Sequence, residues 1–281
     1  MSNSTPKPTS AYYSTGGIIG DIIGSLRERN NERNTTFDLF PTGSKMTDDS
    51  MMTLATMAAI LENETSPDYT AWYKKLYRLY PDAGYGKFFR TWAASDTLDP
   101  IDSFGNGSAM RVGPVGLVAK TYEEAMKQAR LSASITHSHP EGIKGAQAIA
   151  GAVYLAKTFP DMNVSAWGKK EIYYHIVNNI GYDLDFTMKE IRKTYEFSAI
   201  CQHSVPQAIN AFLESDSFES AIRIAISIGG DSDTIAAMAG SIAEAYYGIP
   251  DRISEKANTI IGRNDHARDI IINFDRKYGH K

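Results

Sequence analysis

The chain contains 281 residues, of which 42% are hydrophobic and 22% are charged, and its formal net charge is −4. These proportions are those of an ordinary globular protein, and so weak a net charge argues against a broad nucleic-acid-binding face. A single cysteine, Cys201, excludes an internal disulfide and fits a reducing compartment. No run approaches the roughly 18 apolar residues that a bilayer crossing needs, so we expect a cytoplasmic protein that has no contact with membranes.

Residues 1–14 are polar and rich in Pro and Ser, and they lack the apolar stretch of a signal peptide. We therefore predict a disordered lead-in over this range. The next segment, from Gly16 to Gly24, reads GGIIGDIIG. Its glycines could let a helix pack closely on a neighbour, or could cradle a phosphate. The Lys-Ser/Thr of a phosphate-binding P-loop is absent and no strand precedes the segment, so we favour close packing.

From residue 51 onwards, apolar residues recur mostly with the spacing of a helix. Helices are predicted over residues 51–61, 67–80, 122–136, 142–159, 169–179, 186–194, 206–214, 218–228, 233–247 and 253–261. Convincing alternating strands are missing, and no internal repeat or flexible linker divides the chain. We therefore predict an all-α fold, a single compact multi-helix domain over residues 15–281, and a monomer.

Two acidic clusters lie far apart in the sequence, and each opens a long apolar segment. One is Thr47-Asp48-Asp49, and the other is Asp231-Ser232-Asp233-Thr234, which follows Gly229-Gly230. Each could be a helix cap, with acids in the first turn. Two such clusters together favour a metal site, because four carboxylates brought together repel one another. Hard divalent cations such as Mg²⁺ or Mn²⁺ would convert that repulsion into binding.

Two loop segments carry further candidate residues. The first, from Ser103 to Arg111, reads SFGNGSAMR. Its small residues expose backbone N–H groups that can bind phosphate or sugar oxygens, and Phe104 offers a ring on which a base could stack, although a plain turn is the alternative. The second, residues 136–141, reads THSHPE. Its two histidines could ligate zinc, but no third ligand pattern accompanies them, so we favour a ligand contact or a cap of the following helix.

Five motifs follow one another along the chain: GDIIG with a Glu seven residues after its Asp, then TDDS, SFGNGSAMRVGPVGL, THSHPEGIKGA and GGDSDTIAAMAG. This combination resembles the ADP-ribosylglycohydrolase family, which includes dinitrogenase-reductase-activating glycohydrolase and the ADP-ribosyl-acceptor hydrolases. The resemblance extends over about residues 16–248. It is specific because the motifs agree in order, whereas any one of them alone would be a weak signal.

The resemblance implies an all-α protein with a binuclear centre of two divalent cations, Mg²⁺ or Mn²⁺. The implied metal ligands are Thr47, Asp48, Asp49, Asp231, Asp233 and Thr234, with Asp233 as the bridge between the ions. Glu28 matches a mobile acidic residue near the metals. The implied substrate contacts are Gly86, Ser103, Phe104, Gly105, Asn106, Gly107, Met110 and His137.

The implied activity is metal-dependent hydrolysis of the N- or O-glycosidic bond between ADP-ribose and an acceptor, in an ADP-ribosylated protein or small-molecule conjugate. An oxocarbenium-like transition state is expected. The metals would orient the ribose hydroxyls, and Glu28, Asp48, Asp49 or Asp231 would act as the catalytic general base.

Two other functions are compatible with parts of this pattern. A non-catalytic relative could bind ADP-ribose or serve as a crystallin-like structural protein, but it would have no need of clustered carboxylates. A binuclear phosphoesterase is the second alternative, and the lack of His-Asp ligand pairs in the acidic motifs argues against it.

Overall fold

The computed structural model describes residues 14–28, 31–97, 99–158 and 165–279. Within these ranges the chain forms helices and no strand, and its one β-type pairing is an isolated bridge between Gly105 and Ile200. The prediction of a single compact all-α domain is confirmed. Of the lead-in predicted over residues 1–14, all but Ser14 lies outside the described residues.

The α-helices follow one another along the chain, with longer connections between α1 and α2 and between α4 and α5. They are α1 (Gly16–Gly24), α2 (Asp48–Glu62), α3 (Tyr69–Leu79), α4 (Lys87–Ala94), α5 (Gly113–Val118), α6 (Tyr122–Ser134), α7 (Pro140–Thr158), α8 (Ser165–His175), α9 (Met188–Ile191), α10 (Cys201–Glu214), α11 (Phe218–Ile226), α12 (Ser232–Tyr247), α13 (Asp251–Ile261) and α14 (Asp265–Tyr278). A 3₁₀ turn, η1 (Asn106–Ser108), precedes α5, and a π-helical turn, η3 (Ile176–Ile180), extends α8.

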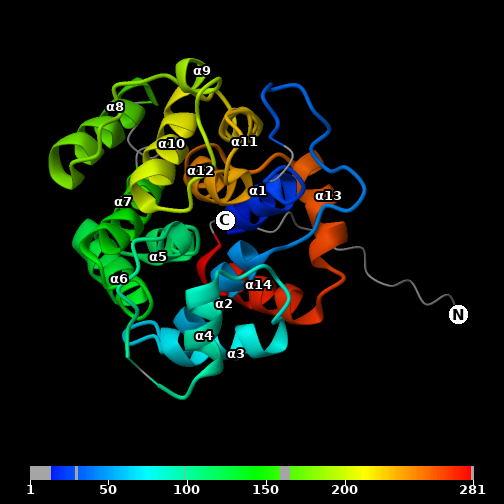
Figure 1. Cartoon of the computed structure of the whole chain (residues 1–281), viewed down its shortest axis with the longest axis vertical. Helices are drawn as coiled ribbons and strands as arrows, with labels where there is room; N and C mark the ends of the chain where they lie inside the picture. The colour runs from blue at the N-terminus through cyan, green and yellow to red at the C-terminus, as the bar shows by residue number, and fades with distance from the viewer. Residues whose placement is uncertain (1–13, 29–30, 98, 159–164, 280–281) are drawn as a thin grey trace, which may run out of the picture.

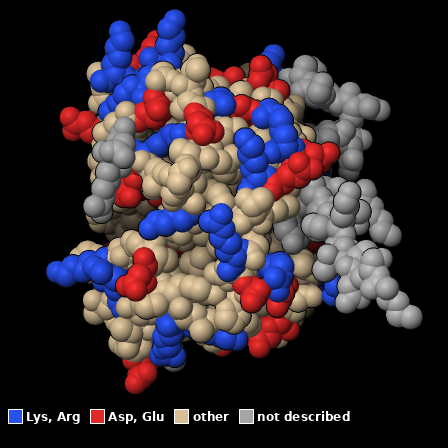
Figure 2. Space-filling model, turned by 90° about the vertical axis from the view of Figure 1, so that its right-hand side faces the viewer, with Lys and Arg blue, Asp and Glu red and all other residues tan. Residues whose placement is uncertain are grey.

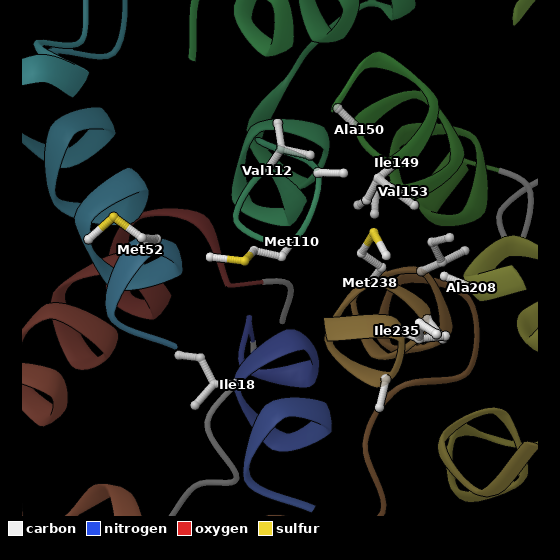
Figure 3. Close-up of a cluster of buried hydrophobic side chains, with 14 of the residues drawn as sticks. Ile18, Met52, Met110, Val112, Ile149, Ala150, Val153, Ala208, Ile235 and Met238 are labelled. Atoms are coloured by element: carbon white, nitrogen blue, oxygen red, sulfur yellow. The ribbon is translucent and has the colours of Figure 1, made fainter. Parts of the chain in front are cut away.

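Helix α12 lies near the centre of the molecule, where it packs against α1, α7, α10 and α11 (Figure 1). Its fully buried Met238 points toward Ile149 and Val153 of α7, with Ala208 of α10 close by (Figure 3). All residues from Ser232 to Ala243 are buried, as expected of a helix that is apolar or small on every side. The acidic first turn of α12 is therefore held deep in the protein.

Glycines bring the backbone of α1 into direct contact with α12. A Cβ atom on Gly20 would lie 2.1 Å from the carbonyl oxygen of Ala236, and one on Gly24 would lie 2.4 Å from the Cα of Asp233. Any larger residue would push the helices apart, so the close-packing interpretation of residues 16–24 is confirmed. The same contact sets Asp21 of α1 beside the first turn of α12.

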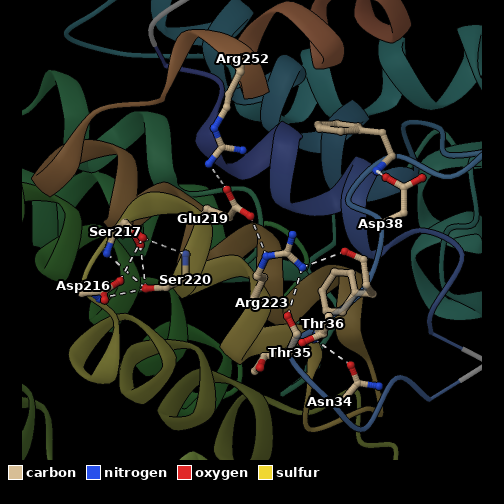
Figure 4. Close-up of polar contacts among 12 residues, drawn as sticks. Asn34, Thr35, Thr36, Asp38, Asp216, Ser217, Glu219, Ser220, Arg223 and Arg252 are labelled. Atoms are coloured by element: carbon tan, nitrogen blue, oxygen red, sulfur yellow. Dashed lines mark hydrogen bonds and ion pairs between the residues drawn. The ribbon is translucent and has the colours of Figure 1, made fainter.

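The segment that connects α1 to α2 is anchored on α11. Arg223 of α11 donates hydrogen bonds to the carbonyl oxygens of Thr35 at 3.1 Å and Phe37 at 2.8 Å (Figure 4). The guanidinium is itself held by Glu219, whose Oε1 accepts from Arg223 Nε at 2.7 Å and whose other oxygen pairs with Arg252 of α13. This network fixes the path by which the chain reaches the start of α2.

Several predicted helices have different bounds in the structure. The helix predicted over residues 169–179 is α8 (Ser165–His175) followed by the π-helical turn η3. Helix α10 begins at Cys201, whereas the prediction began it at Pro206, the residue favoured in a first turn. A preceding turn is formed nonetheless, with Ser204 Oγ donating to the carbonyl oxygen of Ile200 at 2.8 Å. Helix α9 covers only Met188–Ile191 of the predicted 186–194.

Helices α4, α5 and α14 were not predicted. Helices α4 and α5 have eight and six residues, too few turns for a helical period to stand out. Helix α14 does carry a signal: Asn264 caps it by accepting from the N–H of Ala267 at 3.0 Å, and Ala267, Ile271 and Phe274 form its buried face.

The surface shown in Figure 2 carries basic and acidic side chains interspersed, with no broad area of either sign on that face. In the described part of the chain, no helix has both the length and the apolar character that crossing a bilayer requires.

Candidate metal and ligand site

The two acidic clusters meet at a cavity of about 690 Å³. Thr234 Oγ1 donates a hydrogen bond to Asp49 Oδ2 at 3.3 Å, although the two residues are 185 positions apart in sequence. Carboxylate oxygens of Asp21, Asp49 and Asp233 lie within 4.8 Å of one another. The packing of α1, α2 and α12 thus brings together the two helix N-termini that the metal hypothesis requires.

The first cluster is organised by the cap of α2. Thr47 is the N-cap residue, and its Oγ1 accepts from the backbone N–H of Asp49 at 3.4 Å. Asp48 and Asp49 occupy the first turn, where the helix dipole favours negative charge. The capping alternative therefore holds for Thr47, and it does not compete with a metal site, because both acids still face the cavity.

The second cluster is organised differently. Asp231 is the N-cap residue of α12, but its side chain makes no capping hydrogen bond. Its Oδ2 instead accepts from Asn106 Nδ2 at 2.6 Å, a residue of the turn η1. Gly229 and Gly230 precede it with φ angles of +73° and +72°, a left-handed conformation that favours glycine. Simple capping does not explain this arrangement.

Asp21 is a site residue that was not predicted from the sequence. It is completely buried, and its Oδ1 accepts from Thr47 Oγ1 at 2.6 Å. Its Oδ2 accepts from the backbone N–H groups of Thr47 at 2.8 Å and Ser50 at 3.1 Å, and from the Ser50 hydroxyl. Asp21 thereby orients the Thr47 hydroxyl. The available signal was a lone acid among isoleucines in GGIIGDIIG, since a buried charge requires partners.

Burial raises the pKa values of the clustered carboxyl groups. The pKa of Asp48 rises to about 7, first through burial and then through the charge of Asp21. The pKa values of Asp49 and Asp233 lie well above the usual range for the same reasons, burial first and neighbouring carboxylates second. Without a source of positive charge, these groups resist being ionised together.

Asp49 provides a test of whether a cation fits this site. Its Oδ1 is buried and has no hydrogen-bond partner among the described residues, a state that costs free energy unless another group binds the oxygen. Carboxylate and hydroxyl oxygens surround it, and such oxygens are the ligands that hard divalent cations take. The residues present therefore fit a divalent cation.

The cavity is lined by every predicted site residue except Phe104. The lining includes Glu28, Thr47, Asp48, Asp49, Gly86, Ser103, Gly105, Asn106, Gly107, Met110, His137, Asp231, Asp233 and Thr234. Phe104 is 43% exposed, and its ring lies edge-on to His139 with 5.2 Å between centroids. The structure does not bring this ring into the cavity.

Two other exposed phenylalanines line the cavity and were not predicted as site residues. Phe88 of α4 is 72% exposed, and Phe197, which precedes α10, is 57% exposed. Apolar rings left in water beside a cavity are unusual enough to suggest contact with a ligand. No sequence signal identifies them, because a single exposed Phe leaves no periodic pattern.

Glycines keep the cavity walls close to the acids and to His137. Gly84 has φ of +118°, and a Cβ atom on it would lie 3.1 Å from Asp48 Oδ1. On the opposite wall, a Cβ on Gly107 would lie 3.3 Å from His137 Nε2. The His137 ring thus sits directly against the loop formed by residues 105–107.

Comparison with known proteins agrees with this architecture. A family model described as ADP-ribosylglycohydrolase matches residues 14–274. ADP-ribosylhydrolase ARH3 of Homo sapiens is 29% identical, with 85% of each chain covered, and ARH3 of Mus musculus is 30% identical over 72% of this chain and 70% of its own. ADP-ribosylarginine hydrolase Tri1 of Pseudomonas putida is 24% identical over 83% of this chain and 69% of its own.

A solved structure described as an ADP-ribosylglycohydrolase-related protein complex has a similar fold. It superposes with a TM-score of 0.67 at 21% identity, and the match covers 94% of this chain and 97% of that one. At this level of identity the likeness concerns the fold.

Proposed function

The chain belongs to the ADP-ribosylglycohydrolase family, and on that premise we propose that it hydrolyses the glycosidic bond between ADP-ribose and an acceptor. The observation that carries the proposal is the meeting of the two acid-hydroxyl clusters, joined by the hydrogen bond from Thr234 to Asp49, on the wall of a cavity large enough for a nucleotide-sized ligand. Relatives named ADP-ribosylhydrolase and ADP-ribosylarginine hydrolase support the reaction class.

We propose that Thr47, Asp48, Asp49, Asp231, Asp233 and Thr234 would hold two divalent cations. When bound, Mg²⁺ or Mn²⁺ would neutralise the clustered carboxylates and orient the hydroxyls of the distal ribose. Asp21 supports this set, because it accepts the hydrogen bond that the Thr47 hydroxyl donates. The Thr47 oxygen also accepts from the N–H of Asp49, which leaves it one further lone pair for a cation.

Hydrolysis requires a water molecule to attack the anomeric carbon as the bond to the acceptor breaks. A carboxylate must take the proton of that water, and the leaving group must gain one. Among the four predicted catalytic acids, Asp48 and Glu28 are half-buried, whereas Asp49 and Asp231 are buried. Glu28 makes no hydrogen bond to any described residue. Asp48 and Glu28 are therefore the acids best able to reach the attacking water.

The remaining cavity walls would hold the ADP portion. The glycine loop of residues 105–107 offers a surface on which phosphates can approach the backbone. The exposed rings of Phe88 and Phe197 offer faces on which the adenine or an aromatic acceptor can stack. The cytoplasmic location and the monomeric state remain predictions.

The test is release of free ADP-ribose from arginine-, serine- and nucleobase-linked substrates, each assayed with Mg²⁺, with Mn²⁺ and with EDTA. We expect release that EDTA abolishes, and we expect Asp233→Ala to remove both activity and metal binding while far-UV circular dichroism stays unchanged. Asp251→Ala, which alters an exposed acid in the first turn of α13, is the matched control.

Other outcomes would redirect the proposal. Turnover by Asp233→Ala at the wild-type rate would overturn the metal assignment. Binding of ADP-ribose without turnover of any substrate would favour a non-catalytic binding module, and a phosphate monoester as product would favour a phosphoesterase.

A further inference from the structure

Arg111 is a buried positive charge in the wall of the cavity. Its side chain is 1% exposed, and none of the ion pairs among the described residues includes it. The guanidinium lies over the ring of Tyr73 at 4.1 Å, and its Nη2 donates to the carbonyl oxygen of Ser132 at 2.9 Å. A buried cation without an acidic partner is costly, so the position is expected to serve a purpose beyond packing.

The same Nη2 atom also donates to Thr136 Oγ1 at 2.8 Å, and Thr136 Oγ1 lies 2.8 Å from His137 Nδ1. The direction of this second hydrogen bond follows from the first. Thr136 Oγ1 already accepts from Arg111, and His137 Nδ1 is the only acceptor in the described residues that its own proton can reach. The Thr136 hydroxyl therefore donates to Nδ1, which must be unprotonated.

An unprotonated Nδ1 leaves the imidazole proton on Nε2. Burial and the nearby charge of Arg111 hold the pKa of His137 well below its usual value, so the ring is neutral. Nε2 has no acceptor among the described residues, and it lies against the glycine loop, 3.3 Å from where a Cβ of Gly107 would be. His137 lines the cavity, so this N–H group is available to a ligand.

We propose that Arg111 and Thr136 are positioning residues that hold His137 as the neutral Nε2–H tautomer, so that it donates to an oxygen of ADP-ribose lying along residues 105–107. The inference rests on the proposed function for the identity of the ligand. The chain of donors runs from a cation through a hydroxyl to a ring, and each hydrogen bond in such a chain strengthens the next. The Arg111 charge thus polarises the His137 ring and strengthens its Nε2–H group as a donor, while the ring itself stays neutral.

The direct test is the tautomer of His137 in the wild-type protein. Long-range ¹H–¹⁵N correlation spectra of protein labelled on its six histidines, with the His137 signals assigned from a His137→Gln variant, distinguish the two neutral tautomers. We expect the Nε2–H form in wild type and in Thr136→Ser, and a mixture of tautomers in Thr136→Val, which has the same shape but no hydroxyl. An Nδ1–H tautomer in wild type would overturn the proposal.

Calorimetric titration with ADP-ribose in the presence of Mg²⁺ is the second measurement. We expect Thr136→Val to bind about tenfold more weakly, equivalent to about 1.4 kcal/mol, and Thr136→Ser to bind within about threefold of wild type. Equal affinities of wild type and Thr136→Val would show that the relay does not serve the ligand. Failure of the wild-type protein to bind ADP-ribose would instead count against the proposed function, and the tautomer spectra would still decide the relay.

Discussion

In the absence of divalent cations, the half-buried Asp48 carboxyl group is expected to make the protein less stable as the pH rises. Its pKa is raised from 3.8 to about 7 in the folded protein, chiefly by burial. A group whose pKa is higher in the folded state contributes stability below its unfolded pKa, and that contribution is lost as the pH rises through the folded pKa. Replacing Asp48 with Asn removes the cost of ionisation.

The magnitude follows from the size of the pKa change. Each pH unit between 3.8 and about 7 changes the free energy of unfolding by about 1.4 kcal/mol. Between pH 5.5 and pH 7.5, Asp48 therefore accounts for a loss of about 2 kcal/mol. For a domain of 281 residues, that loss lowers Tm by roughly 3 °C. A cation present at a hundred times its Kd would add back about 2.7 kcal/mol.

The assay is thermal unfolding of wild type and Asp48→Asn, in EDTA, at several pH values from 5.5 to 7.5. Other groups also titrate in this range. His137, whose pKa is lowered by burial, works in the opposite direction, because its stabilising contribution is lost as the pH falls. That contribution is common to both proteins, so the difference in Tm between them reports the Asp48 charge, including its repulsion of the neighbouring Asp49. Asp251→Asn serves as the control for an exposed acid.

We expect Asp48→Asn to be more stable than wild type in EDTA, by a margin that grows as the pH rises. Added Mg²⁺ should raise the Tm of wild type and should raise that of the variant much less. A margin that does not change with pH, or a variant less stable than wild type in EDTA at pH 7.5, would refute the reasoning.

Two further predictions concern the helix contact and the cavity mouth. Gly20→Ala should lower the free energy of unfolding by about 1–3 kcal/mol in urea titrations, because its Cβ would lie 2.1 Å from the carbonyl oxygen of Ala236. Gly86→Ala, whose Cβ would meet nothing within 4 Å, should lower it by less than about 1 kcal/mol. Equal losses in the two variants would contradict the close-packing account. Phe197→Ala should weaken ADP-ribose binding about five- to tenfold in calorimetry, at the low end of the range for stacking. Phe104→Ala should weaken binding less. The reverse order would assign the stacking role to Phe104.

The features that could be predicted from the sequence are those with a local cause. A hydroxyl and two acids before an apolar run indicate the first turn of a buried helix, and this holds at both Thr47 and Asp231. Closely spaced glycines indicate close packing, which α1 and α12 display. These patterns identify both halves of the site because each half is built within a few consecutive residues.

The residues that were missed depend on contacts between distant parts of the chain. Asp21 becomes a site residue only because Thr47 and Ser50 surround it; a lone acid among isoleucines indicates that it needs partners, but not which residues they are. Thr136 lies beside His137, but its role depends on Arg111, which arrives from a different segment. Phe88 and Phe197 become candidate ligand contacts because the fold places both in the lining of one cavity, and their spacing in the sequence does not indicate this.

The contact between the first turns of α2 and α12 also has a kinetic consequence. The hydrogen bond from Thr234 to Asp49 closes a loop of 185 residues, and contacts so distant in sequence form late and slowly. The two halves of the site come together only when that loop has closed, so cations would have little to bind in the folding transition state. Interactions absent from the transition state slow unfolding rather than speed folding. A bound ion would therefore lower the rate of unfolding, and so lengthen the lifetime of the folded protein, without speeding its folding.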